Sequence, residues 1–244
     1  MKIYILVWTA ILYSASLSSL PAQDSKDSLW GRAVEIFSQN DDWVPGLING
    51  RFELLNSQGD VTDLTLSQTK LVLNQANQVE SQIIQVIHNG QDVTAKSAAE
   101  NSSEEDGEKQ EFSFEESPFN PEIQDRVSVR LTDERIVIDG KPCVIYEYSL
   151  LISDQTRSGK IWLDTLSGVP VQNEFTQEPL PKHVKKLINR IFYRCNADGS
   201  FYVDKISFEG SGGFLLIKKN FRGEMIFSNY WRWDRNSSKS NNPQ

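Results

Sequence analysis

The spacing of hydrophobic positions along this chain changes near residue 40. Between Ser28 and Phe37 the apolar residues recur at helical spacing, and Asp27 or Ser28 is placed to cap the segment. The apolar face of this segment holds Trp30, Ala33, Val34 and Phe37. The pattern predicts one amphipathic helix ahead of the rest of the folded chain.

From residue 50 onward the apolar residues alternate at strand spacing, in short runs separated by turn residues. Asn89-Gly90, Asp139-Gly140 and Asp198-Gly199 tolerate the positive φ that a tight turn between strands requires. We predict strands at 52–55, 70–73, 81–88, 135–138, 141–152, 157–164, 169–175, 190–195, 200–208, 213–221 and 223–233. Strands of this length and spacing favour a sandwich, a barrel or a strongly curved antiparallel sheet.

Two segments interrupt the strand pattern. A helix is predicted from Pro181, which suits a first helical position. Its apolar face would hold Val184, Leu187, Ile188 and Ile191. Residues 94–118 are rich in Ala, Ser and Glu and show no apolar period, so we interpret them as a disordered insertion. The strand pattern resumes after this insertion, which favours one domain over two.

Charge is distributed unevenly along the chain. Residues 100–116 hold eight acidic residues and one lysine, and so account for most of the net charge of −8. From Lys182 onward the chain is basic, with twelve Lys or Arg against five Asp or Glu. Such asymmetry is informative about partners rather than about the fold. The basic end can face anionic lipid headgroups or the acidic segment, or form part of an ordinary mixed-charge surface.

The first residues have the plan of a secretory signal peptide. Lys2 is followed by an uncharged run over 3–12 and by a small-residue stretch that ends at Ala22. We predict cleavage after Ala22, which gives a signal peptide over 1–22, one domain over 23–233 and a disordered tail over 234–244. An exported, soluble, periplasmic protein is therefore expected. An uncleaved membrane anchor is the alternative.

The chain has two cysteines, Cys143 and Cys195. In an exported protein an even pair permits one disulfide. Two separate buried thiols are the alternative, because the sequence does not give the distance between the two Cα atoms. Neither cysteine lies among the first 142 residues, so lipid attachment through a lipobox-type cysteine is excluded.

A search for catalytic motifs favours a protein that is not an enzyme. Neither His88 nor His183 has a second ligand at a spacing typical of metal sites. The sequence has no Gly-x-Ser-x-Gly elbow, no Walker loop and no dinucleotide-binding loop. We therefore expect no cofactor and no metal. Basic and aromatic residues do alternate over 230–235, but export and a pI near 4.9 argue against nucleic-acid binding.

Several strands are apolar on at least one face. From Cys143 to Ile152 the apolar face carries Val144, Tyr146, Tyr148, Leu150 and Ile152, and near the end of the chain Met225, Phe227, Trp231 and Trp233 alternate along one face. Some strands, such as the one near Phe214, are apolar on both faces and need two covers. Helices can supply one cover. The other is a bound ligand or ordinary core packing.

One stretch carries a family resemblance. Gly159-Lys-Ile-Trp-Leu-Asp-Thr-Leu-Ser-Gly-Val-Pro-Val resembles the strand, Asp-x-x-x-Gly turn and strand of periplasmic outer-membrane lipoprotein carriers, the LolA/LolB/RseB-like superfamily. The order of elements over 28–233 is similar as well. The resemblance implies a mainly β fold with a few helices, in which a curved antiparallel sheet forms an open half-barrel covered by helices. It also implies binding of acyl chains or lipoproteins without covalent chemistry.

Together these observations predict a periplasmic carrier for lipid acyl chains or lipoproteins. The predicted ligand-binding residues are Val144, Tyr146, Tyr148, Leu150, Trp162, Phe214, Leu216, Phe227 and Trp231. The expected partners are a hydrophobic ligand and an envelope protein, with peripheral contact to a membrane. The alternatives are an envelope interaction or scaffold module with a fully packed sheet, and a hydrolase of envelope glycans or lipids that uses a carboxylate pair.

Overall fold

The computed structural model describes residues 26–40, 42–103, 116–196, 199–214 and 217–234. The predicted signal peptide, most of the acidic segment and the tail from residue 235 lie outside the described residues. The helical elements are α1 (Ser28–Ser38), α2 (Thr94–Ser103) and the short 3-10 helix η1 (Pro121–Arg126). None of the helices in the described part of the chain is long and apolar enough to cross a bilayer.

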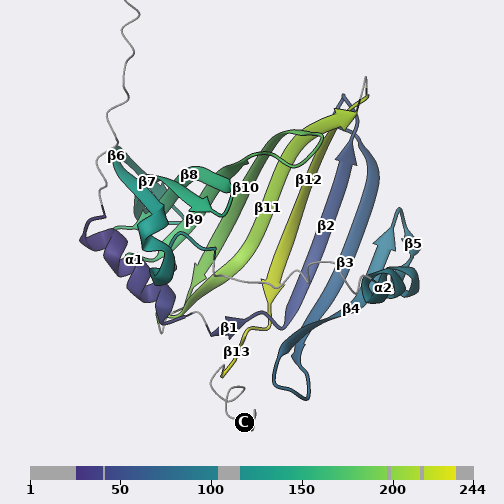
Figure 1. The fold of residues 1–244 in the computed structure, drawn as a ribbon, viewed down its shortest axis with the longest axis horizontal. Helices are drawn as coiled ribbons and strands as arrows, with labels where there is room; N and C mark the ends of the chain where they lie inside the picture. Colours follow the sequence, from purple (N-terminus) through teal and green to yellow (C-terminus); the bar gives the residue numbers. More distant parts are fainter. Residues whose placement is uncertain (1–25, 41, 104–115, 197–198, 215–216, 235–244) are drawn as a thin grey trace, which may run out of the picture.

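One antiparallel sheet contains eleven of the described strands, in the order β5-β4-β3-β2-β12-β11-β10-β9-β8-β7-β6 (Figure 1). Its strands are β2 (Leu47–Leu55), β3 (Val61–Leu73), β4 (Val79–His88), β5 (Gln91–Asp92), β6 (Val127–Ile138), β7 (Lys141–Ile152), β8 (Gln155–Asp164), β9 (Pro170–Glu178), β10 (Val184–Cys195), β11 (Phe201–Phe214) and β12 (Ile217–Ser228). The sheet does not close, which confirms the predicted mainly β fold and open half-barrel.

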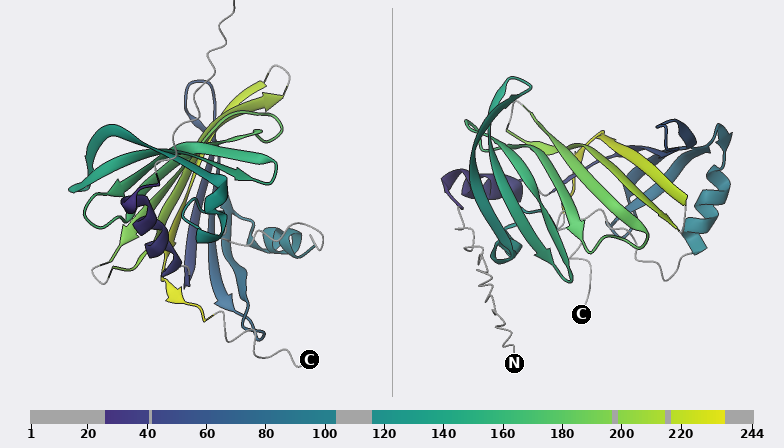
Figure 2. Two further views of the ribbon diagram at one scale, coloured as in Figure 1. Left: turned by 60° about the vertical axis from the view of Figure 1, so that its left-hand side comes forward. Right: turned by 90° about the horizontal axis from the view of Figure 1, so that it is seen from above.

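Two meanders make up this sheet, and they meet at its centre. Strands β2 to β5 follow one another in the chain, and so do β6 to β12, while β2 and β12 pair with each other from Leu47↔Ser228 to Leu55↔Asn220. A second, two-stranded sheet joins β1 (Trp43–Val44) to β13 (Trp231–Arg232). Figure 2 shows the strongly twisted sheet with α1 and α2 near its opposite ends.

Helix α1 forms where the sequence predicts it. The Asp27 carboxylate accepts hydrogen bonds from the Leu29 and Trp30 backbone N–H groups at 3.1 and 3.0 Å, and so caps the first turn. The buried face holds Trp30, Ala33 and Phe37, and Val34 is half-buried. The predicted apolar stripe is therefore the surface that packs on the sheet.

Two of the three predicted tight turns are also found, while the third includes Asp198, which lies outside the described residues. Asn89 and Gly90 have φ of 48° and 82°, and Asp139 and Gly140 have φ of 49° and 77°. Both turns need positive φ at two successive residues, which Asn, Asp and Gly accept most readily. The Asp-x-x-x-Gly turn from Asp164 to Gly168 joins β8 to β9, as predicted.

The predicted helix after Pro181 is wrong, because residues 184–195 form strand β10. Their apolar positions fit a helical face and a strand equally well. Pairing decides the outcome, since β10 is hydrogen-bonded to β11 on one side and to β9 on the other. Branched and aromatic residues such as Ile191, Phe192 and Tyr193 favour the strand as well.

Two boundaries near the end of the chain also differ from the prediction. Strand β11 continues through Gly210 to Phe214, and β12 runs without a break across residue 222, where a gap between strands was predicted. The sequence Gly210-Ser-Gly-Gly looks like a break in a strand. In the structure Gly210 instead lets the Phe221 ring approach the backbone of β11 closely.

The predicted disordered insertion is wrong for its first part, because residues 94–103 form α2. Three alanines favour the helical conformation there, and the Thr94 N–H donates to the Asp92 carboxylate at 2.9 Å at its start. Residues 104–115 lie outside the described residues.

The sheet has two faces, which we call the α1 face and the opposite face. The opposite face carries a charge ladder that crosses eight strands with alternating sign. Neighbouring members are cross-strand partners, apart from Arg190 and Glu209, which are joined diagonally at 3.1 Å. The charge ladder consists of Arg130, Glu147, Lys160, Glu174, Arg190, Glu209, Arg222 and Glu53. Opposite charges side by side stabilise this register of the strands.

Glu53 is the buried member of the charge ladder, with 3% of its surface exposed. Its carboxylate accepts hydrogen bonds from the Nε atoms of Arg222 at 2.5 Å and of Arg51 at 2.8 Å. These two guanidinium groups lower the pKa of Glu53, against the effect of burial. A lowered pKa means that the carboxylate stabilises the fold above its unfolded-state pKa and that this stability is lost as the pH falls.

We expect Glu53→Gln to lower the free energy of unfolding at pH 7 by about 1–3 kcal/mol, because charge-assisted hydrogen bonds at a buried carboxylate are lost. Urea denaturation between pH 7 and pH 3 checks this, and the difference from the wild-type protein should shrink as the pH falls. Glu147→Gln is the matched control, since the Arg130–Glu147 pair is exposed and should contribute less than about 1 kcal/mol. Equal losses for the two variants would contradict the expected effect of burial.

Candidate ligand-binding face

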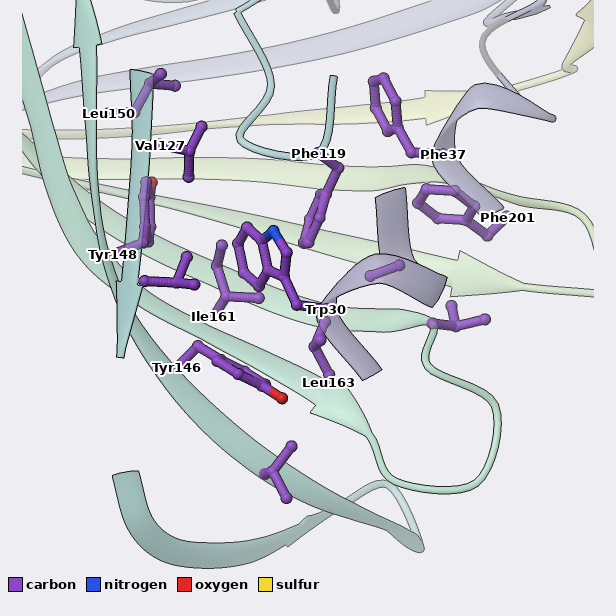
Figure 3. Close-up of a cluster of buried hydrophobic side chains, with 14 residues drawn as sticks. Trp30, Phe37, Phe119, Val127, Tyr146, Tyr148, Leu150, Ile161, Leu163 and Phe201 are labelled. Atoms are coloured by element: carbon purple, nitrogen blue, oxygen red, sulfur yellow. The ribbon is translucent and has the colours of Figure 1, made fainter. Parts of the chain in front are cut away.

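The α1 face is closed by packing at the β6–β9 end of the sheet. Trp30 of α1 inserts between Phe119 and Tyr146, with ring centroids 5.2 and 5.5 Å from its own (Figure 3). Phe37, on the same face of α1 two turns further along, packs against Phe201 of β11, with ring centroids 6.3 Å apart. The side chains of the chain itself therefore fill this part of the half-barrel.

Hydrogen bonds fix α1 in this position. The Tyr146 hydroxyl donates to the two carboxylate oxygens of Asp27 at 2.7 and 2.8 Å, and Trp30 Nε1 donates to the Gln124 side chain at 3.0 Å. Burial, followed by the hydrogen bond to Asp27, raises the pKa of Tyr146, so its hydroxyl stays protonated and acts as a donor. Asp27 thus caps α1 and joins it to β7 at the same time.

Four of the predicted ligand-binding residues lie in this closed core. Val144, Tyr146, Tyr148 and Leu150 follow one another along the α1 face of β7, and each is buried. The alternation predicted for this strand is therefore present, and α1 is its cover. Contact between these four residues and a ligand stays a prediction.

The other predicted residues are spread over the molecule. Trp162 is half-buried on the opposite face of β8, Phe227 is buried on the α1 face of β12, and Trp231 is half-buried in β13. The side chain of Phe214 and all of Leu216 lie outside the described residues. The structure does not bring the described members of the set together around one cavity.

The two cysteines are free thiols, so the disulfide alternative is wrong for this structure. Cys143 is buried in β7, where burial and then the charge of Asp164 raise the pKa of its thiol. A raised pKa keeps the sulfur protonated and poorly reactive. Cys195 is half-buried at the end of β10.

Beyond the reach of α1, three phenylalanines form a cluster on the α1 face at the centre of the sheet. Phe52 of β2, Phe208 of β11 and Phe221 of β12 have ring centroids 6.2, 6.4 and 6.4 Å apart. Phe52 is 36% exposed and the other two are half-buried. We call these three residues the phenylalanine platform.

Glycines opposite two of the rings allow these rings to approach the backbone of the sheet closely. A Cβ added at Gly223 would collide with the Phe208 ring, and one added at Gly210 would collide with the Phe221 ring. The cross-strand pairs Phe208↔Gly223 and Gly210↔Phe221 place each ring over the missing side chain. The result is an aromatic surface in which Phe52 is exposed and Phe208 and Phe221 are half-buried.

Half-buried apolar residues continue the α1 face from the platform toward the core. They are Phe175, Ile191, Ile206 and Met225. Polar residues interrupt this surface. Asn189 of β10 is the cross-strand partner of both Phe175 and Phe208. Asn173 of β9 is buried close to the hydroxyls of Tyr148 and Tyr193. Burial raises the pKa of both tyrosines, and the hydrogen bond from Asn173 opposes the shift. These neutral groups add hydrogen-bonding capacity to an otherwise apolar surface.

A second depression lies on the opposite face, over β12, β2, β3 and β4. It has a volume of about 290 Å³. Its lining is mixed, with the apolar side chains of Leu66, Ile87 and Ile226 next to Gln68, Arg51 and Glu224. This depression has a mixed polar and apolar lining, unlike the phenylalanine platform.

Neither surface has groups arranged for metal chemistry. Within the described residues no three side chains of His, Cys, Asp or Glu come together. His88 lies at a strand end, 3.1 Å from the Thr65 hydroxyl and 3.6 Å from the Asp63 carboxylate. The geometry of the α1 face suits contact with an apolar ligand.

The fold and this surface define a class of protein: an open antiparallel half-barrel with one end closed by a helix and a partly exposed aromatic surface at its centre. The Phe52, Phe208 and Phe221 set was not predicted from the sequence. Its three members lie far apart in the chain, and only the register of β2, β12 and β11 brings them together. The glycines at 210 and 223 were the only local signal.

No family model and no curated protein matches this chain. Among solved structures, a DUF1329 family protein from Desulfovibrio piger is 13% identical, with a TM-score of 0.39 over 87% of this chain and 94% of that chain. MucB in complex with MucA(peri) is 9% identical, with a TM-score of 0.23 over 84% and 98%. The MucA/MucB complex of Pseudomonas aeruginosa is 9% identical, with a TM-score of 0.25 over 84% and 98%. These likenesses are distant, and membership of the lipoprotein-carrier superfamily stays a prediction.

The bond between Asp27 and Tyr146 gives a test of how α1 is held. We expect Asp27→Ala to lower the free energy of unfolding by about 1–3 kcal/mol, because the helix loses its cap and Tyr146 loses its acceptor. Tyr146→Phe keeps the cap and should cost about 1 kcal/mol. Urea denaturation measures both, with exposed Asp154→Ala as the control. A larger loss for Tyr146→Phe than for Asp27→Ala would contradict this assignment.

Proposed function

We propose that the protein is an envelope binding protein that holds a lipid acyl chain on the α1 face, without covalent chemistry. The observation that carries the proposal is the phenylalanine platform, an aromatic cluster that no described helix covers. It adjoins further half-buried apolar residues, so an extended apolar chain can lie across β2, β12 and β11. A periplasmic location follows from the predicted signal peptide.

The physical chemistry of this surface favours an acyl chain over a polar ligand. Each buried methylene contributes about 0.8 kcal/mol, so a chain that lies flat over several rings gains several kcal/mol. The close approach of the rings to Gly210 and Gly223 keeps this surface near the backbone, which suits a flexible and narrow ligand that follows the sheet. Apolar lining with a few polar groups is typical of such sites. Asn189 and Thr65, the cross-strand partners of Phe208 and Phe52, are polar residues next to the platform that could orient a polar end.

A second candidate function is that of an envelope interaction module. The depression of about 290 Å³ on the opposite face favours it, because its mixture of apolar and charged lining residues suits a protein segment. The two functions use different faces of the same central strands. Substitutions on the two faces of β2 and β12 therefore distinguish them.

We expect Phe52→Asp to weaken binding of a fluorescent fatty acid by at least about tenfold, because a charge in the platform opposes burial of the chain. Phe52 is partly exposed, so the fold should tolerate the change. Fluorescence titration gives the affinity, and thermal melting with circular dichroism checks that the variant is folded. Native mass spectrometry of the purified protein, followed by organic extraction, then identifies any acyl-containing species that co-purifies.

Ile226→Asp is the matched control, since Ile226 is an exposed apolar residue of β12 on the opposite face. Its binding of the probe should equal that of the wild-type protein. Unchanged binding in Phe52→Asp would reject the phenylalanine platform as the site. Loss of binding in Ile226→Asp alone would move the ligand to the depression on the opposite face.

A further inference from the structure

Two neighbouring turns at one end of the sheet expose large apolar side chains. Leu166, in the turn between β8 and β9, is 77% exposed, and Val137, near the tip of the β6–β7 hairpin, is 66% exposed. These are the two most exposed large hydrophobic residues in the described part of the chain. Ile136, next to Val137, is exposed as well.

The two turns lie side by side. Val137 is the cross-strand partner of Pro142. The Pro142 carbonyl accepts hydrogen bonds from the Thr165 backbone N–H at 2.9 Å and from its hydroxyl at 3.1 Å. Leu166 directly follows Thr165, so Leu166 and Val137 belong to one edge of the molecule. We call residues 136–142 together with 164–168 the hairpin end.

The turn that carries Leu166 is held by its own hydrogen bonds. The Asp164 carboxylate accepts from the Leu166 N–H at 2.9 Å and from the Ser167 hydroxyl at 2.8 Å. The Gly168 N–H donates to the Asp164 carbonyl at 2.8 Å, at a φ of 77° that favours glycine. Asp164 itself is buried. A turn held by its own hydrogen bonds thus keeps the leucine in solvent beside the exposed Val137, and neighbouring exposed apolar residues mark contact sites.

Three cations, Arg32, Arg135 and Lys141, lie on the segments next to the exposed apolar side chains. Arg32 of α1 donates to the Leu166 carbonyl at 3.3 Å, and Arg135 donates to the Thr132 and Glu134 carbonyls at 2.8 Å. Neither arginine forms an ion pair within the described residues, unlike the arginines of the charge ladder. Lys141 lies in the same hairpin. The carboxylates nearby are Asp139 at the tip, the buried Asp164, and Asp133 and Glu134 ahead of Arg135, of which Glu134 lies 3.7 Å from Lys160.

We propose that the hairpin end docks on a bilayer surface that contains anionic lipids. Leu166 and Val137 enter the boundary between headgroups and acyl chains, while Arg32, Arg135 and Lys141 meet lipid phosphates. Apolar side chains on a protruding edge and cations just behind them are the two features that bind proteins to such an interface. This docking does not depend on the proposed acyl-chain site, which lies on other strands.

Co-sedimentation of the purified protein with vesicles tests the proposal. The protein should bind vesicles of phosphatidylcholine mixed with phosphatidylglycerol, and bind pure phosphatidylcholine vesicles more weakly. Combining Leu166→Gln with Val137→Thr should lower the partition coefficient by roughly tenfold, because two apolar side chains no longer enter the bilayer. Lys141→Gln should weaken binding to the anionic vesicles only, and added salt should do the same.

Leu151→Gln is the matched control, because Leu151 is 52% exposed but lies at the other end of β7. Its partition coefficient should equal that of the wild-type protein. Absence of binding by the wild-type protein, an equal loss in the control, or no loss in the double variant would each overturn the proposal. So would a change of molar mass of the double variant without vesicles, because the hairpin end would then be a contact between proteins. Fatty-acid probe binding without vesicles should stay unchanged in all these variants, which separates this test from that of the acyl-chain site.

Discussion

The burial of Trp30 against Phe119 and Tyr146 is the contact on which the arrangement of the half-barrel depends. It places α1 at one end of the sheet and completes the core there. A helix of 11 residues is about 16 Å long, whereas eleven strands spaced by about 4.8 Å extend over about 48 Å. Helix α1 can therefore cover only part of the α1 face. Because the helix is shorter than the sheet is wide, α1 does not cover the phenylalanine platform.

The two faces of the sheet meet water in different ways. The α1 face combines a closed core with a half-exposed aromatic surface, while the opposite face carries the charge ladder. Each charged member of the ladder has oppositely charged neighbours, so that face can be exposed to solvent without a covering helix. This division places the phenylalanine platform on one side of the central strands, and the exposed leucine and valine of the hairpin end at an edge. Binding of a chain and contact with a bilayer thus use separate parts of the molecule.

Local patterns predicted local structure well in this protein. The α1 stripe, the Asn89-Gly90 and Asp139-Gly140 turns and the Asp164–Gly168 turn depend on neighbouring residues, and the structure confirms them. Strand β10 was mistaken for a helix because its apolar positions satisfy both periods and only pairing with β9 and β11 distinguishes them. The phenylalanine platform was missed for a related reason: the register between distant strands is set by the whole sheet. The predicted lining residues of β7 lie on the buried face of that strand, and α1 covers that face.

The pairing of β2 with β12 has a consequence for how the protein folds. Each meander contains contacts between strands that are close in the chain, whereas the β2–β12 pair joins Leu55 to Asn220 and closes a very long loop. Long-range pairings have to offset the entropy of loop closure, so we expect this junction to form late. Phe52 stands on one side of the junction, and Phe208 and Phe221 stand on the other. The aromatic surface therefore comes into existence with the final joining of the two meanders, and an incompletely folded chain would not carry it.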